Sequence, residues 1–142
     1  MSLTLDQIVA RLEDPETPVV WLDPATPEEF WNNLPGALVA RGLAVLNLDG
    51  GLPIVDHDSL LERFSQVAPL AVDFLQTLTS LKDCLLKLPH QTSRGWVVMF
   101  RSPEALRQND EATFEDFLEI LELVHESQYE IHHRVFKLVV RD

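Results

Sequence analysis

The sequence predicts an α/β domain in which a small parallel sheet of three or four strands is flanked by helices. Four short segments are rich in β-branched and aromatic residues and nearly continuous in apolar character, as is typical of strands buried on both faces of a parallel sheet. Helical patterns separate these segments in the order helix, strand, helix, strand, two helices, strand, two helices, strand. Right-handed crossovers between successive strands are then expected.

The predicted strands are short and apolar. Their bounds are Val19–Leu22, Leu43–Leu48, Trp96–Phe100 and Val135–Val140. With 142 residues, the chain is long enough to bury a core without disulfide bonds, so we expect a single domain. The first forty residues would add a layer to the same sheet, and a semi-independent N-terminal hairpin is the alternative for them.

Several of the predicted helices begin with recognisable capping sequences. Thr4–Gln7 (TLDQ) fits a capping box, and Thr26–Glu29 (TPEE) combines a capping residue, proline at the first helical position and an acid three residues on. Asp58 and Ser102 would begin two further helices. The longest helix is expected at about Phe114–Glu126.

The charge of the chain restricts its partners. It has 23 acidic and 11 basic residues, a net charge of −12 and a pI of about 4.7. Such a surface repels nucleic acid and anionic lipid, which are bound through Lys and Arg, and it would steer a basic protein toward the chain. Solubility alone is the alternative reason for the acidity.

Membrane segments and secretion signals are not expected. Apolar runs such as Trp96–Phe100 are far too short to span a bilayer. The N-terminus is acidic and has no basic segment followed by an apolar one. A single cysteine suits a reducing compartment, so we expect a cytoplasmic protein.

The segment Phe74–Leu88 is predicted to be a helix whose two faces differ. Apolar residues recur at spacings of four and three, and Cys84 falls among them, which favours a small buried side chain over a reactive or metal-binding thiol. Asp83 falls on the opposite, solvent-facing side. It is either a recognition carboxylate or an exposed charge with a weak pair to Lys87.

An acidic stripe is predicted on the longest helix. Residues 110–130 contain eight acids and no lysine or arginine. Glu119 and Glu122 belong to a row of glutamates three and four residues apart on one helix face, where like charges disfavour the helix slightly. The row could be a docking face for a basic protein or a solvated helix face.

Signals for catalysis, metals and cofactors are weak. The adjacent pair His132 and His133 falls near a strand start, where side chains alternate between faces. The chain has neither a phosphate-binding glycine motif nor a nucleophile elbow. We therefore expect no catalytic residue, no metal and no cofactor. The rival hypothesis is a small enzyme or ligand-binding domain with polar residues at the carboxyl ends of the strands, near Asn47, Asp49, Arg101 and Arg141.

The order of elements and the tripeptide Asp83-Cys84-Leu85 together resemble the barstar family, the intracellular inhibitors of barnase-type ribonucleases. The resemblance runs from about Leu43 to Val140. It divides the single domain into an N-terminal extension, residues 1–41, and a barstar-like core, residues 42–142. It also implies the small parallel sheet flanked by helices.

The resemblance implies a binding site as well. The family's helix opens with a Gly-x-Asn-x-Asp pattern, and Leu75, Thr77 and Thr79 stand at those three positions here. Lys82 stands where many members carry a large aromatic residue, and Leu123 falls near an acidic contact of the family. The residues expected to bind the partner are Asp83, Asp73, Gln76, Thr79, Ser80, Glu119 and Glu122.

The function expected from the sequence is therefore protein binding rather than catalysis. The partner would be a basic protein such as a barnase-like ribonuclease or related toxin, bound and inhibited by a monomer in a 1:1 complex. A barstar-fold scaffold with a different protein partner is the alternative. Neither nucleic acid nor a membrane is expected as a partner.

Overall fold

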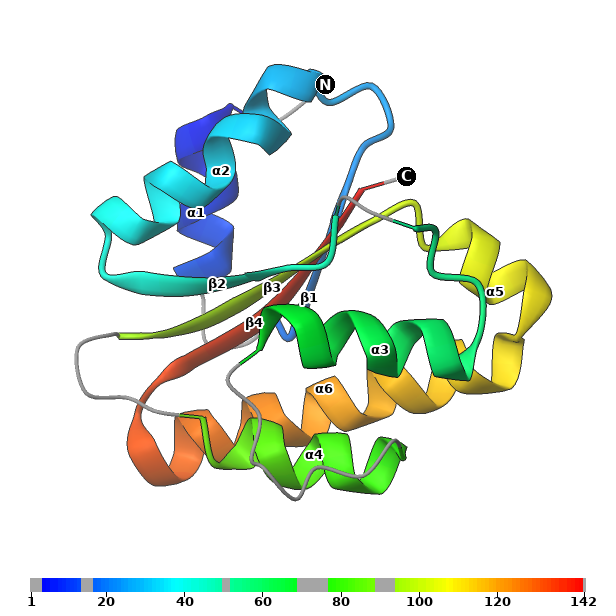
Figure 1. Cartoon of the computed structure of the whole chain (residues 1–142). Coiled ribbons are helices and arrows are strands. Elements are labelled where there is room, and N and C mark those ends of the chain that lie inside the picture. The colour runs from blue at the N-terminus through cyan, green and yellow to red at the C-terminus, as the bar shows by residue number, and fades with distance from the viewer. Residues whose placement is uncertain (1–3, 14–16, 50–51, 69–76, 89–93, 142) are drawn as a thin grey trace.

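The structure is a computed structural model that describes residues 4–13, 17–49, 52–68, 77–88 and 94–141. Its elements follow the predicted order (Figure 1). They are α1 (Leu5–Glu13), β1 (Val19–Leu22), α2 (Glu28–Ala40), β2 (Leu43–Asn47), α3 (His57–Val67), α4 (Leu78–Leu86), β3 (Gly95–Arg101), α5 (Glu104–Asn109), α6 (Glu111–His132) and β4 (Val135–Arg141).

The four strands form one parallel sheet in the order β1-β4-β3-β2. In its centre Val98 of β3 lies opposite Leu138 of β4. The two central strands are buried along almost their whole length, because helices cover both faces of the sheet. The predicted strands and the α/β fold class are confirmed, with strand bounds that differ by a single residue at most.

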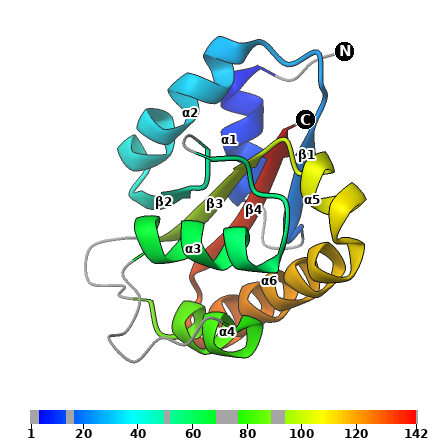
Figure 2. The ribbon, with the colours of Figure 1, turned by 45° about the vertical axis from the view of Figure 1, so that its right-hand side comes forward.

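Two apolar clusters fill the space between the sheet and its two helical layers. On one face, side chains of α1 and α2 such as Leu12 and Trp31 pack against alternate strand residues such as Met99. On the other, side chains of α3, α4, α5 and α6 pack against the remaining strand residues, among them Phe100. Figures 1 and 2 show this three-layer arrangement from two sides.

The extension shares the sheet with the rest of the chain. Val20 of β1 lies opposite Val139 of β4, so β1 is an edge strand of the common sheet. Helices α1 and α2 cover the face on which Val139 is buried. The division of one domain into an extension and a core stays a prediction.

The predicted capping residues agree with the structure at some helices and differ from it at others. At α1 the capping box is confirmed, since Thr4 N–H donates to Gln7 Oε1 at 2.9 Å and Gln7 N–H to Thr4 Oγ1 at 3.2 Å. At α3 the capping residue is Asp56, not Asp58, and its carboxylate accepts from the N–H of Ser59.

At α2 the prediction of a capping threonine was wrong. Pro27 is the capping residue and makes no side-chain cap. Thr26 is buried instead, and its carbonyl oxygen accepts from the guanidinium of Arg141. The carbonyl oxygen of Thr26 thereby joins the segment before α2 to the end of β4.

The helix bounds around the acidic segments also differ from the prediction. Helix α4 begins at Leu78, with Thr77 as its cap, whereas the expected start at Phe74 lies outside the described residues. Helix α6 starts earlier than expected and runs six residues beyond Glu126. Asp110 caps it, and it ends at His133 in the left-handed conformation. No helix in the described part of the chain is long and apolar enough to cross a bilayer.

Candidate partner-binding site

A surface groove of about 250 Å³ lies between α4 and α6, which pack against each other. Its apolar side chains are Leu78 of α4 and Ile120 and Leu123 of α6. Four polar side chains line the rest of it. These are Thr79 and Lys82 of α4 and Asp116 and Glu119 of α6.

The sequence of α4 explains which side chains reach this groove. Thr77 accepts a hydrogen bond from the N–H of Ser80 at 3.1 Å, which starts the helix at Leu78. Leu81 and Leu85, one turn apart, are buried against the core. The helix is thereby rotated so that Leu78, Thr79 and Lys82 face the groove.

Cys84 is half-buried, so the prediction of a core position was wrong. Leu81, Leu85 and Leu88 occupy the buried stripe. Cys84 lies at the edge of that stripe, because helical periodicity places it about 60° away from Leu81. It is a partly exposed apolar side chain of α4.

Asp83 is exposed, as the sequence predicted. It follows Thr79 by four residues and therefore lies on the same helix face, one turn further along. Among the described residues none forms an ion pair with Asp83, including the neighbouring Lys82 and Lys87. The weak intrahelical pair that a merely solvated Asp83 was expected to form with Lys87 is absent.

The outer face of α6 is acidic. Five acidic side chains along it are exposed, and none of them forms an ion pair with any residue in the described ranges. They are Glu115, Asp116, Glu119, Glu122 and Glu126. Leu123 lies among them and is 50% exposed. The face presents negative charge around one exposed apolar side chain.

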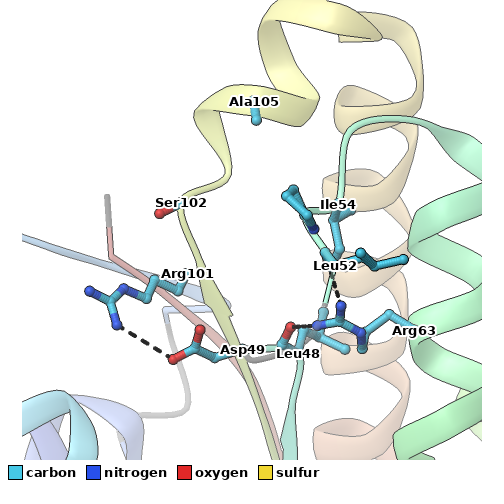
Figure 3. A pocket seen from close by; sticks show the side chains of 9 residues that line it. Leu48, Asp49, Leu52, Ile54, Arg63, Arg101, Ser102 and Ala105 are labelled. Atoms are coloured by element: carbon cyan, nitrogen blue, oxygen red, sulfur yellow. Dashed lines mark hydrogen bonds and ion pairs between the residues drawn. The ribbon is translucent and has the colours of Figure 1, made fainter.

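A second pocket, also of about 250 Å³, lies at the carboxyl ends of β2 and β3 (Figure 3). It is where the sequence suggested an enzyme or ligand site. Asp49 lies in this pocket opposite Arg101, at 3.7 Å. Asp49 also accepts a hydrogen bond from Trp31 Nε1 at 3.0 Å.

The charged groups of this second pocket bind other parts of the chain. Glu28 of α2 pairs with both Arg101 and Arg141. The guanidinium of Arg63, which is 8% exposed, donates to the carbonyl oxygens of Leu48 and Leu52. The polar residues do converge there, and their contacts hold α2 and the segment after β2 in place.

Two carboxylates with lowered pKa values cap helices. Hydrogen bonds from the backbone and side chain of Ser59 lower the pKa of Asp56. Hydrogen bonds from the side chain and backbone of Thr113 lower the pKa of Asp110. In the ranges that the structure describes, no three His, Cys, Asp or Glu side chains are grouped so as to hold a metal ion.

Comparison with family models decides the family of the chain. The model of Barstar (barnase inhibitor) matches residues 43–141, well over half of the chain. The chain belongs to the barstar family. Comparison with curated proteins returned no match. The matched range includes both helices of the groove and leaves out α1, β1 and α2.

The structure of this barstar-family chain brings some of the expected site residues together. Thr79 and Glu119 line one groove from α4 and α6, and Asp83 lies one turn beyond Thr79. Ser80 is half-buried, and Glu122 is exposed without lining the groove. Two further expected residues, Asp73 and Gln76, lie outside the described residues.

Sequence reasoning did not include the groove's apolar residues or Asp116 among the site residues. A signal was present, since Asp116, Ile120 and Leu123 follow one another at spacings of four and three on the acidic helix. The sequence does not show which helix forms the other wall of the groove, because only tertiary packing brings Leu78 and Lys82 of α4 to these residues.

Proposed function

We propose that this barstar-family chain is an acidic protein-binding module that binds and inhibits a basic ribonuclease or related toxin. The binding surface is the exposed face of α4 and α6. The observation that carries the proposal is Asp83, an exposed carboxylate without an ion pair to any described residue. It stands in the Asp-Cys-Leu motif, beside a groove with acidic groups on its α6 side.

Electrostatics supports a basic partner. Asp83 and the exposed acids of α6 lie on neighbouring helices, in a chain of net charge −12. Like charges three and four residues apart destabilise a helix by roughly 0.2–0.5 kcal/mol per pair. A cationic partner relieves this repulsion and is steered to the face by the field of the whole chain.

The contacts in the pocket at the carboxyl ends of the strands agree with inhibition rather than catalysis. Asp49, Arg101 and Arg141 lie at the carboxyl ends of the strands and are engaged with α2. The family is described as that of an inhibitor of barnase. A cytoplasmic location and a monomer that forms a 1:1 complex remain predictions.

A second candidate function is a scaffold with the same fold and a different protein partner. The observation that favours it is the pair Thr79 and Lys82 on the α4 wall of the groove. By the family resemblance, an aspartate and a large aromatic residue are usual at these positions. The two substitutions replace a negative charge with a hydroxyl and an aromatic ring with a positive charge.

Titration of a barnase-type ribonuclease with the purified chain tests the proposal. Inhibition should reach completion at one chain per enzyme, and the association rate should fall as salt is added. Binding without inhibition would favour the scaffold function. Absence of both binding and inhibition would overturn the ribonuclease proposal.

A further inference from the structure

We propose that the groove between α4 and α6 receives one apolar side chain from a basic segment of the partner. The recognised feature would be a leucine-sized residue with Lys or Arg on both sides. This inference rests on the proposed function, because it concerns the same face and specifies what that face selects.

The size of the groove favours a single side chain over a small-molecule ligand. Its volume of about 250 Å³ is below the range of roughly 300–1,000 Å³ that is usual for ligand pockets. The groove is also open along the surface between two helices, so a ligand would remain largely in water. A side chain that projects from a docked protein surface avoids this problem, since the surrounding interface excludes the water.

The floor of the groove is apolar and incompletely covered. Leu78 and Ile120 are partly buried and pack against the main core, which fixes their positions. Leu123 is 50% exposed next to them. An apolar side chain placed against these three would remove the exposed part of Leu123 from water, which is favourable in proportion to the apolar area covered.

The charges around the groove select against an acidic occupant. Asp116 and Glu119 line it from α6, and they would repel an acidic side chain. Lys82 lines it from α4 and offsets part of the attraction of these two carboxylates for a basic side chain. The neutral floor is therefore best filled by an uncharged apolar group, whereas the exposed acids beyond it attract cations on either side.

Peptide titration followed by methyl and amide NMR tests this inference. One probe peptide is Lys-Arg-Leu-Arg-Lys, the second has Ala in place of Leu, and both have blocked termini. The leucine peptide should shift the methyl signals of Leu78, Ile120 and Leu123 and bind about tenfold tighter than the alanine peptide. The alanine peptide should shift chiefly the amides of the acidic residues.

A matched pair of variants tests whether the preference for the leucine peptide depends on the groove or on any exposed apolar residue of α6. Leu123→Asn should remove the difference between the two peptides. Ile131→Asn changes a residue of α6 that is 67% exposed and does not line the groove, and it should leave the difference intact. Both positions are exposed, so both variants should fold.

The outcomes distinguish this inference from the proposed function. Equal binding of the two peptides by the wild-type chain would overturn the inference, while the basic-partner proposal would stand. Binding of neither peptide would also overturn the inference. A peptide preference that survives Leu123→Asn would place the apolar contact elsewhere and overturn it too.

Discussion

Trp31 of α2 donates its indole N–H to the carboxylate of Asp49, which follows β2, at 3.0 Å. The contact joins the extension to the part of the chain matched by the family model. Nearby, Glu28 of the same helix pairs with Arg101 and Arg141 at the ends of β3 and β4. These bonds fix α2 against the carboxyl edge of the sheet.

Removal of the indole donor should destabilise the fold and leave partner binding intact. Trp31→Phe keeps most of the buried aromatic volume and leaves the partly buried carboxylate of Asp49 with one donor fewer. The free energy of unfolding should fall by about 1 kcal/mol or more, as measured by urea denaturation. Asn33→Gln, an exposed change on the same helix, should stay within about 0.5 kcal/mol of wild type. Equal stability of Trp31→Phe and Asn33→Gln would contradict the structural role of the contact.

Stability should decline in acid through the two capping carboxylates. The pKa values of Asp56 and Asp110 lie below their ordinary value of 3.8, because Ser59 and Thr113 donate hydrogen bonds to the charged forms. A lowered pKa in the folded state stabilises the fold fully above about pH 4, and that stability is lost as the pH falls through the folded value.

The double variant Asp56→Asn and Asp110→Asn tests this pH dependence. Asparagine retains an oxygen that can accept from the helix N–H groups, but it does not titrate. The free energy of unfolding, measured from neutral pH to below pH 3, should fall less steeply for the variant than for wild type. Identical slopes would mean that other groups cause the acid sensitivity.

Gly95 should be intolerant of any side chain. A Cβ at this position would lie 2.0 Å from the carbonyl oxygen of Val135, and the φ angle of Gly95 is +154°. Gly95→Ala should therefore lower the free energy of unfolding by more than about 1 kcal/mol. A Cβ added at Gly36, in α2, would meet no atom within 4 Å, so Gly36→Ala should stabilise the chain by about 0.5–1 kcal/mol. Similar effects of the two substitutions in thermal denaturation would contradict the close approach of β3 and β4.

An aspartate in place of Thr79 should strengthen binding to a barnase-type ribonuclease. It would stand one turn before Asp83 on the same helix face and near the amino end of α4, where negative charge is favourable. A charged hydrogen bond gained at the interface should raise the affinity by at least about tenfold, as measured by titration calorimetry. Gln66→Glu adds the same charge on the exposed side of α3 and should have a much smaller effect. If Thr79→Asp gains no more than Gln66→Glu, the α4 face does not contact this enzyme.

The strands could be predicted from the sequence because burial on both faces leaves a continuous apolar signature, as in 96–100. Helix starts were less predictable, since Thr26 follows the local capping rule, yet the capping residue of α2 is Pro27, which makes no side-chain cap. The exposure of Asp83 followed from helical phase alone. The apolar floor beside it depends on α4 packing against α6, a contact between distant segments that no local pattern encodes.

The most direct test of the proposed function compares two aspartates for binding to a barnase-type ribonuclease. Asp83 lies on α4 beside the groove, whereas Asp6 is an exposed aspartate on α1, on the opposite face of the sheet. Each substitution by alanine removes the same charge from the chain. Surface plasmon resonance should give a dissociation constant at least about tenfold higher for Asp83→Ala and nearly unchanged for Asp6→Ala. Equal dissociation constants for the two variants, or no binding by the wild-type chain, would contradict the proposed function of the α4 face.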